Sequence, residues 1–180
     1  MNYLQVEPLY VISLEEIFWG GILVAITMAI HGSGMLTVLR VNHEVKNWFG
    51  SKKRGLMAGL FSIILASCMI IIVHLVEVVV WSMFFLWKGA FVNTSIAFYF
   101  SLNEYTTVGS TFNLPKHWRL LEGMIATAGL LTFAWSTGVL ITLTQEFQNQ
   151  RMDLYKQRHQ KRSAKVMAPD NKDSDNAHDG

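Results

Sequence analysis

The hydrophobic pattern of the chain is dominated by three long apolar runs, at residues 17–39, 56–87 and 120–143. No run holds more than two acidic, basic or histidine side chains. A helix needs roughly 20 predominantly apolar residues to cross a membrane, and all three runs reach this length. The pattern therefore predicts an all-α integral membrane protein with three transmembrane helices, the last of which extends over residues 119–146.

A fourth, half-apolar stretch lies between the last two runs, at residues 97–115 (AFYFSLNEYTTVGSTFNLP). It is too short to cross a membrane and too hydrophobic for an ordinary loop in water. Non-helical backbone at membrane depth is tolerated only where it is buried in protein or lines a watery cavity. We therefore expect a short helix at 95–105, capped by Asn93 or Thr94, that dips into the membrane and returns as an extended strand.

Composition and cysteine usage leave little room for a catalytic domain. Hydrophobic residues make up 51% of the 180 residues, and they are concentrated in the apolar runs. The single cysteine, Cys68, can form neither an internal disulfide nor a metal cluster, and we expect it to be a small buried residue. No nucleotide-binding, zinc-finger or Ser-His-Asp arrangement stands out in the sequence. We therefore expect no enzyme, no catalytic residue and no nucleic-acid partner.

Basic residues are concentrated in two of the polar segments. Five lie in the linker 40–54 and six lie between 151 and 165, whereas residues 1–16 carry no Lys or Arg. Cytoplasmic loops carry an excess of Lys and Arg. We therefore expect a plasma (inner) membrane protein with segment 1–16 outside, and with the linker 40–54 and the tail 148–180 in the cytoplasm. The basic part of the tail could touch anionic lipid heads, and its last residues are expected to be disordered.

The segment TTVG at residues 106–109 follows an aromatic-rich short helix and precedes Pro115 by six residues. In this placement it resembles the pore loop of potassium-type cation channels. The flanks, HLVEVVVW before the loop and WRLLEG and FAWST after it, are similar to bacterial small ion-channel-like membrane proteins with a two-helix pore unit. The resemblance implies a pore domain at 55–147 with an outer helix at 56–87, a homotetramer in membrane lipid, and K⁺ or Na⁺ as the permeant ion with no other cofactor. The selectivity filter would then consist of Thr106, Thr107, Val108, Gly109, Ser110 and Thr111.

The second half of this loop departs from the family's pattern. Ser110, Thr111 and Phe112 stand where that pattern has Tyr, Gly and Asp. Consecutive carbonyl groups that point the same way require residues of alternating handedness. Gly109 accepts a positive φ freely, whereas a positive φ at the β-branched Thr111 would be an outlier. We therefore expect a wider or remodelled outer half, one or two inner ion sites, and altered or weak potassium selectivity.

Three ionisable side chains lie well inside the predicted membrane helices: His31, His74 and Glu77. His74 and Glu77 are three residues apart and share a helix face. They could form a polar brace behind the pore loop, relay protons, or offer two metal ligands. His31 could add a third ligand, although metal binding would need still more ligands or a symmetric partner. We favour the brace, because a buried charge persists only when it is paired or hydrogen-bonded, and we predict no metal site. For His31 we expect a neutral imidazole bonded to a neighbouring helix, rather than a functional group of its own.

Polar residues at the end of the short helix are the remaining candidates for filter support. Helices of this kind aim their partly negative C-terminal ends at the cation. Glu104 could attract cations, hydrogen-bond the filter amides from behind, or pack against the backbone of a neighbouring chain. The predicted filter support consists of Asn103, Glu104, Phe112, His74 and Glu77.

Positions in the two long helices around the loop carry further expectations. Gly129 stands where related channels bend an inner helix to gate, so it is a possible gating hinge, and close helix packing explains it equally well. Trp81, Phe85 and Trp87 are expected at the membrane interface, near the outer end of their helix. Ser136 and Thr137 are expected to bond to the backbone of their own helix.

These observations together predict a cation channel of the potassium-channel-like superfamily. Two other classes remain open. The chain could be a non-conducting relative with a structural or regulatory role, which a flux measurement on purified protein would distinguish from a channel. Less favoured is a metal-dependent membrane protein built on His74 and Glu77, which metal analysis before and after His74→Ala would test.

Overall fold

The computed structural model of the chain describes residues 12–48 and 55–167. The chain divides into two units, Met1–Ile141 and Thr142–Gly180. The expectations for residues 1–11, for the linker residues 49–54 and for the tail residues 168–180 lie outside the described residues. The described residues contain helices and no strand, and these are α1 (Leu14–Trp48), α2 (Gly55–Trp87), α3 (Thr94–Tyr105), the short 3-10 helix η1 (Lys116–Trp118) and α4 (Leu120–Met167).

Three of these helices, α1, α2 and α4, are long and apolar enough to cross a membrane. The all-helical fold with three apolar helices, typical of a multi-pass membrane protein, is therefore confirmed. α1 continues to Trp48, beyond the predicted end at 39, and α4 continues to Met167, along the polar segment 144–166 that the sequence allows as a continuation of the helix. The polar residues that follow each apolar run include good helix formers and no proline, so nothing in the local sequence stops either helix where its hydrophobic pattern ends.

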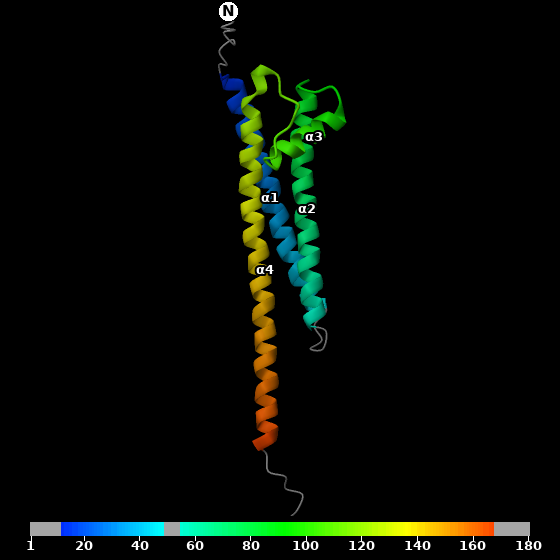
Figure 1. Cartoon of the computed structure of the whole chain (residues 1–180), viewed down its shortest axis with the longest axis vertical. Helices are drawn as coiled ribbons and strands as arrows, with labels where there is room; N and C mark the ends of the chain where they lie inside the picture. The colour runs from blue at the N-terminus through cyan, green and yellow to red at the C-terminus, as the bar shows by residue number, and fades with distance from the viewer. Residues whose placement is uncertain (1–11, 49–54, 168–180) are drawn as a thin grey trace, which may run out of the picture. The chain divides into compact units, whose positions relative to one another are not determined.

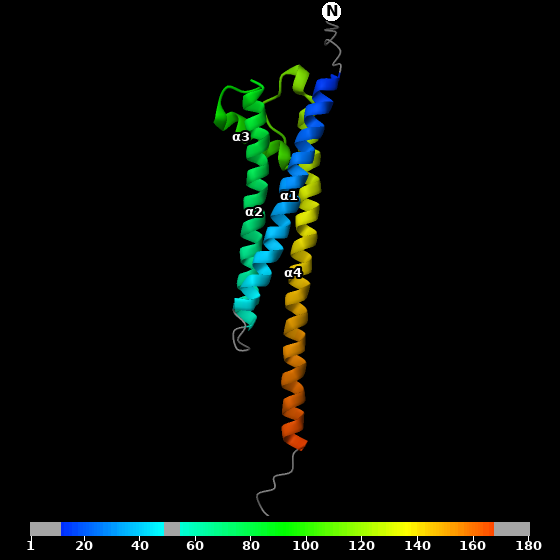
Figure 2. The same cartoon turned by 180° about the vertical axis from the view of Figure 1, so that it is seen from behind.

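In the first unit, α1 and α2 run side by side, and the part of α4 that belongs to this unit packs beside them (Figure 1, Figure 2). α3 and the loop after it lie at the end of the unit where α2 ends and where α1 and α4 begin (Figure 1). The chain therefore enters α3 and leaves for α4 on the same side. The extended strand expected after the short helix is wrong, because Thr106 and Thr107 form a turn whose amides bond back to α3.

The tip of α3 lies deep within the first unit. The carbonyl of Tyr105, the last residue of α3, lies against Gly129 of α4. Gly129 comes nine residues after the start of α4 at Leu120, which places this contact about 14 Å along the helix at 1.5 Å per residue.

Side chains close the open ends of α1 and α3. Ser13 and Glu16 form a reciprocal capping box at the start of α1, with the Ser13 amide 3.0 Å from Glu16 Oε2 and the Glu16 amide 3.1 Å from Ser13 Oγ. The other oxygen of the Glu16 carboxylate accepts the amide of Leu120 (3.2 Å), so one buried carboxylate serves two helix starts. Asn93 accepts the amides of Ser95 and Ile96, which confirms it as the cap of α3.

A cluster of buried apolar side chains fills the space between α3 and the long helices. Trp81 and Phe85 of α2 are fully buried in it, so the expectation that they lie at the membrane interface is wrong. The reason is that α3 folds back over this face of α2, and the Trp81 indole donates to Thr27 Oγ1 of α1 (3.0 Å). The members of the cluster are Leu23, Val78, Trp81, Phe84, Phe85, Phe100, Tyr105, Leu114, Trp118, Leu121, Ile125 and Ala128.

Cys68 lies on a face of α2 that the rest of the chain leaves exposed. Its side chain is exposed, so the expectation of a buried thiol is wrong. It shares α2 with other exposed apolar side chains, such as Ile64 and Ile71. An apolar helix face that the rest of the chain leaves uncovered suits contact with lipid, where an uncharged thiol costs little.

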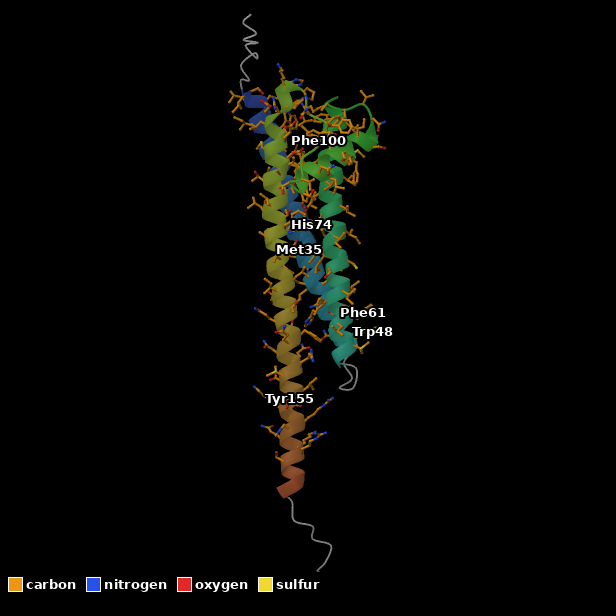
Figure 3. The ribbon with its side chains drawn as sticks, viewed as in Figure 1. Met35, Trp48, Phe61, His74, Phe100 and Tyr155 are labelled. Atoms are coloured by element: carbon orange, nitrogen blue, oxygen red, sulfur yellow. The ribbon has the colours of Figure 1, made fainter. Side chains whose placement is uncertain are left out.

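The second unit consists, in its described part, of α4 from Thr142 onward. Its basic side chains are solvent-exposed, and they are interspersed with polar residues. Figure 3 shows the side chain of Tyr155 among them. The exposed basic residues are Arg151, Lys156, Arg158, Lys161 and Arg162.

Candidate functional site

The loop after α3 hydrogen-bonds back onto the last turn of that helix. Four successive loop amides, those of residues 107–110, take part. Their acceptors are two backbone carbonyls and one carboxylate oxygen of residues 103 and 104. The bonds run from Thr107 to the Glu104 carbonyl (3.0 Å), from Val108 and Gly109 to the Asn103 carbonyl (2.9 and 3.3 Å), and from Ser110 to Glu104 Oε1 (2.9 Å).

These four bonds fix the direction of the carbonyl groups on the other side of the loop. In a planar trans peptide the carbonyl points away from the amide of the next residue. Because the amides of 107–110 all face α3, the carbonyls of 106–109 all face away from it. Thr107, Val108 and Gly109 are exposed in the single chain, Val108 by 74%. The loop thus presents a row of four backbone oxygens on its open side.

The backbone dihedrals of the loop show how this row is made. Thr107 has a φ of +61° and Gly109 a φ of +80°, whereas Val108 between them has an ordinary negative φ. Gly109 therefore takes the positive φ that the sequence predicts. Thr111 does not have a positive φ, in line with the expectation that a β-branched residue avoids it. The second positive φ lies at Thr107, which the sequence did not predict, and the bonds from residues 107–110 to the end of α3 hold it there.

A positive φ at Thr107 is unusual for a β-branched residue. Such a conformation costs of order 1–3 kcal/mol and persists only where the surroundings enforce it. Here the amides on both sides of Thr107 are bonded to α3. Strained backbone of this kind concentrates at functional sites, which makes the row of carbonyls a candidate site in its own right.

The Glu104 carboxylate acts behind the loop. Of the three roles considered for it, the structure shows the hydrogen bond to a loop amide, that of Ser110. Burial raises the pKa of the Glu104 carboxyl above its ordinary value of 4.5, the Ser110 amide opposes this rise, and the nearby Glu122 carboxylate adds to it. Glu122 in turn accepts the amide of Leu114 (2.9 Å), so two carboxylates hold the two ends of the loop.

The other predicted support residues next to the loop, Asn103 and Phe112, both contact Tyr99 of α3. Asn103 donates from its side chain to the carbonyl of Tyr99 (2.8 Å), and its own carbonyl accepts two loop amides. Phe112 packs edge-on against the ring of Tyr99, with the ring centroids 6.2 Å apart. Asn103 thus contributes to the site through its backbone, which a prediction based on side-chain type does not capture.

A buried polar cluster lies directly beneath the loop, and it joins all four helices. At its centre is the Glu77 carboxylate of α2, which is fully buried. The hydroxyl of Tyr105 donates to Glu77 Oε2, and the Nδ1 atom of His31 on α1 lies 2.9 Å from Glu77 Oε1. His74 Nδ1 lies 2.8 Å from the Tyr105 hydroxyl and 3.4 Å from Glu77 Oε2. Figure 3 labels His74, which faces inward from the middle of α2.

Two hydroxyl groups of α4 complete the cluster. Thr132 Oγ1 lies 2.5 Å from the Tyr105 hydroxyl. Ser136 Oγ lies 3.0 Å from His74 Nε2 and 3.3 Å from His31 Nε2. Ser136 therefore bridges two imidazoles on other helices, and the expectation that it bonds within its own helix is not what the structure shows.

These contacts can all be hydrogen bonds at once. The Tyr105 hydroxyl donates to Glu77 Oε2 and accepts from His74 Nδ1, His31 Nδ1 donates to Glu77 Oε1, and Ser136 Oγ lies between the two Nε2 atoms. The buried Glu77 carboxylate is thus held by donors from α1 and α3, as the cost of burying a charge requires.

The cluster brings together three of the residues that the sequence singles out. His74 and Glu77 lie behind the loop, in the place expected for a brace, and His31 has a partner on a neighbouring helix, as predicted. Tyr105 and the two hydroxyls of α4 are missing from the prediction. Their signal in the sequence is weak: Tyr105 looks like one more aromatic residue of α3, and Thr132 and Ser136 look like small polar interruptions in an apolar run.

Gly129 provides the space for the tip of α3. A Cβ atom at this position would overlap the Tyr105 carbonyl oxygen. This close approach is the helix-packing explanation of the glycine, and the gating hinge stays a prediction.

A lysine just after the end of α2 contacts several aromatic rings. The Lys88 ammonium is 3.2 Å from Glu15 Oε1 and lies over three indole rings, those of Trp19, Trp87 and Trp118, at 4.4–5.2 Å from their centroids. Each of these rings comes from a different segment of the chain. Lys88 therefore ties α1, the end of α2 and η1 together, close to where the chain enters and leaves α3.

Comparison with protein-family models, with curated protein sequences and with solved structures finds no match to this chain.

Proposed function

We propose that this protein is a channel for monovalent cations, in which four chains place the loop at residues 106–111 around a common axis. The observation that carries the proposal is the direction of the four carbonyls of residues 106–109, which face away from α3. A cation that leaves water needs oxygen ligands nearly as good as its hydration shell, and rings of backbone carbonyls supply them.

The exposure of residues 107–109 in the single chain supports an assembly of several chains. One chain offers a single row of oxygens, and backbone polar groups at membrane depth must be buried in protein or line a watery cavity. Closed rotational symmetry would convert each oxygen of the row into a ring. The resemblance of the TTVG segment to potassium-type pore loops favours four chains over other numbers.

The depth of the tip of α3 supports the same function. At about 14 Å from the start of α4, the loop would begin near the middle of the hydrocarbon layer. The partly negative end of the α3 dipole lies at this depth and favours a cation there. The buried cluster around Glu77 serves as the brace that holds this helix end in place.

We propose weak discrimination between potassium and sodium. Rings from residues 106–109 give a short row of sites, and the chain bends away after Ser110. Fewer sites in series give weaker discrimination. The basic linker and tail favour a plasma (inner) membrane protein with its N-terminus outside, so that the loop would enter from the outer face.

A flux assay on purified protein in liposomes tests the channel, with thallium or rubidium as the tracer ion. The informative variant is Gly109→Ala, because nothing crowds a Cβ there and only the positive φ is lost. Gly123→Ala is the matched control, since it also meets open space but lies inside α4. We expect cation uptake by the wild type and by Gly123→Ala, and a strong loss in Gly109→Ala. Uptake no faster than in empty liposomes, with folded wild-type protein, would reject the channel.

A further inference from the structure

We propose that His31, His74 and Glu77 form a binding site for one divalent transition-metal ion, with Zn²⁺ as the best fit. One ligand atom from each of the three side chains lies within 4.8 Å of the other two. The residues come from two helices, so the folded chain assembles the site. The set of two imidazoles and one carboxylate is one that zinc uses in proteins.

The distances within the triad suit a single ion. Ligands at about 2.0–2.2 Å from a tetrahedral zinc ion lie roughly 3.3–3.6 Å from each other. The Nδ1 atom of His74 is 3.4 Å from Glu77 Oε2, and that of His31 is 2.9 Å from Glu77 Oε1. Both imidazoles thus turn the same ring atom toward the carboxylate. The ligand atoms of the three side chains all lie within 4.8 Å of one another, so small side-chain shifts would bring them around one ion.

The outer ring atoms are already held as metal-binding imidazoles require. A histidine that binds a metal through one nitrogen almost always donates from the other to an oxygen, which fixes the orientation of the ring. Here the Nε2 atoms of both His31 and His74 face Ser136 Oγ, at 3.3 and 3.0 Å. A hydroxyl oxygen has two lone pairs, so Ser136 can accept from both rings at once.

The Tyr105 hydroxyl is the natural fourth ligand. It contacts both Glu77 and His74 Nδ1, on the side of the triad that faces the loop. It would complete a tetrahedral set of two nitrogens and two oxygens, and it would tie α3 to α1 and α2 through the ion.

Protons and charges balance when the divalent ion binds to the cluster. Each imidazole binds as the neutral ring, through Nδ1 and with its proton on Nε2, so any other ring proton is released. The hydroxyl proton of Tyr105 is released when Tyr105 binds as a phenolate. The divalent ion, the Glu77 carboxylate and the phenolate then sum to zero charge, which suits a buried site.

The ligand set also restricts which ions fit. Mg²⁺ and Ca²⁺ take six or more oxygen ligands, which this cluster does not offer. Imidazole nitrogens suit zinc, copper, nickel and iron. The inference departs from the expectation of no metal site, which was made because the sequence does not show that His31 meets His74 and Glu77. The third ligand, His31, is 43 residues before His74 in the sequence and meets it only in the fold.

The test is a titration of purified, tag-free, chelator-treated protein in detergent with Co²⁺, followed by Zn²⁺. We expect about one Co²⁺ per chain with the intense visible bands of tetrahedral cobalt, and their loss when Zn²⁺ displaces it. His31→Gln and His74→Gln should each weaken binding at least about tenfold. The control His43→Gln, which changes an exposed histidine of α1, should bind as the wild type does.

Two results would overturn the site: no saturable binding by the wild type, or equal loss of binding in all three variants. If the buried variants fail to fold, X-ray absorption of the zinc-loaded wild type decides instead. Two imidazoles and two oxygens around the ion support the site, and a shell of six oxygens overturns it. None of these measurements depends on ion flux, so a negative result for the metal site does not reject the channel, and a negative flux result does not reject the metal site.

Discussion

The hydroxyl of Tyr105, the last residue of α3, donates to the buried carboxylate of Glu77 on α2. The next residue after Tyr105 begins the row of carbonyls that we propose as the cation path. The Tyr105 hydroxyl, which also contacts His74 and Thr132, therefore connects the loop to a cluster that reaches α1 and α4. The geometry of the loop depends on a group that lies behind it and outside the path itself.

Replacement of Tyr105 by phenylalanine should destabilise the protein and disturb the loop. The variant leaves Glu77 Oε2, Thr132 and His74 without their common partner, and an unsatisfied buried group costs about 1–3 kcal/mol. We expect a clearly lower unfolding temperature in detergent and a reduced cation flux. Tyr99→Phe on the same helix is the control, since Tyr99 is 50% exposed, and it should change neither quantity. If the two variants have the same unfolding temperature and the same cation flux, the Tyr105 hydroxyl contributes to neither.

The membrane helices follow directly from the sequence, because their signal is local. Each apolar run is long enough by itself to specify a spanning helix, whatever the rest of the chain does. The cap at Asn93 is equally local, since its side chain bonds only to amides within the next three residues. Helix ends were missed where polar helix formers continue a helix beyond its apolar part, as they do after Leu39.

The site could be predicted only where its parts are neighbours in the sequence. His74 and Glu77 share a face of one helix, so their pairing was visible. Their meeting with Ser136 depends on how α4 packs, over a separation of about 60 residues, and no local pattern encodes it. The positive φ at Thr107 was missed for a related reason, because it comes from amides that bond back to α3 and not from the preference of the residue itself.

Replacement of Gly129 by alanine should separate the packing explanation of this glycine from the hinge. An added Cβ would overlap the backbone carbonyl of Tyr105, which cannot move without the tip of α3. We expect a loss of about 1–3 kcal/mol in stability, as for other overpacked sites, measured by thermal unfolding. Gly138→Ala on the same helix meets nothing within 4 Å and should be neutral or stabilising. A fully stable Gly129→Ala protein with altered opening would instead favour the hinge.

The Glu104 carboxyl should make stability depend on pH in a defined direction. Its pKa is raised in the folded chain by burial, so the folded state holds the proton more tightly than the unfolded state. The contribution of Glu104 to stability is therefore full below pH 4.5 and decreases as the pH rises from 4.5 through the raised pKa. We expect this decrease to be absent in Glu104→Gln, which can still accept the Ser110 amide. The measurement is the difference between the unfolding temperatures of the two proteins across that pH range, and a difference that grows in the other direction would contradict the assignment.

Replacement of Lys88 by glutamine should loosen the end of the first unit. The ammonium interacts with three indole rings and with Glu15, and a cation over an aromatic ring contributes about 0.5–2 kcal/mol. We expect a lower unfolding temperature and a shift of tryptophan fluorescence, with only a small effect of salt, because most of the interaction is with the rings. Lys116→Gln, which changes an exposed lysine of η1, should leave both signals unchanged. If both lysine variants behave alike, the contact with the rings adds nothing to stability.

Electrical recording from purified protein in a planar lipid bilayer tests the proposed channel most directly. With a KCl gradient across the membrane, we expect discrete current steps whose reversal potential has the sign of cation selectivity. Replacement of KCl by NaCl on one side should shift that potential only slightly, as weak discrimination requires. The same steps should disappear in Gly109→Ala and persist in Gly123→Ala. A silent membrane, or a reversal potential of the opposite sign, would contradict the claim that the carbonyls of residues 106–109 conduct cations.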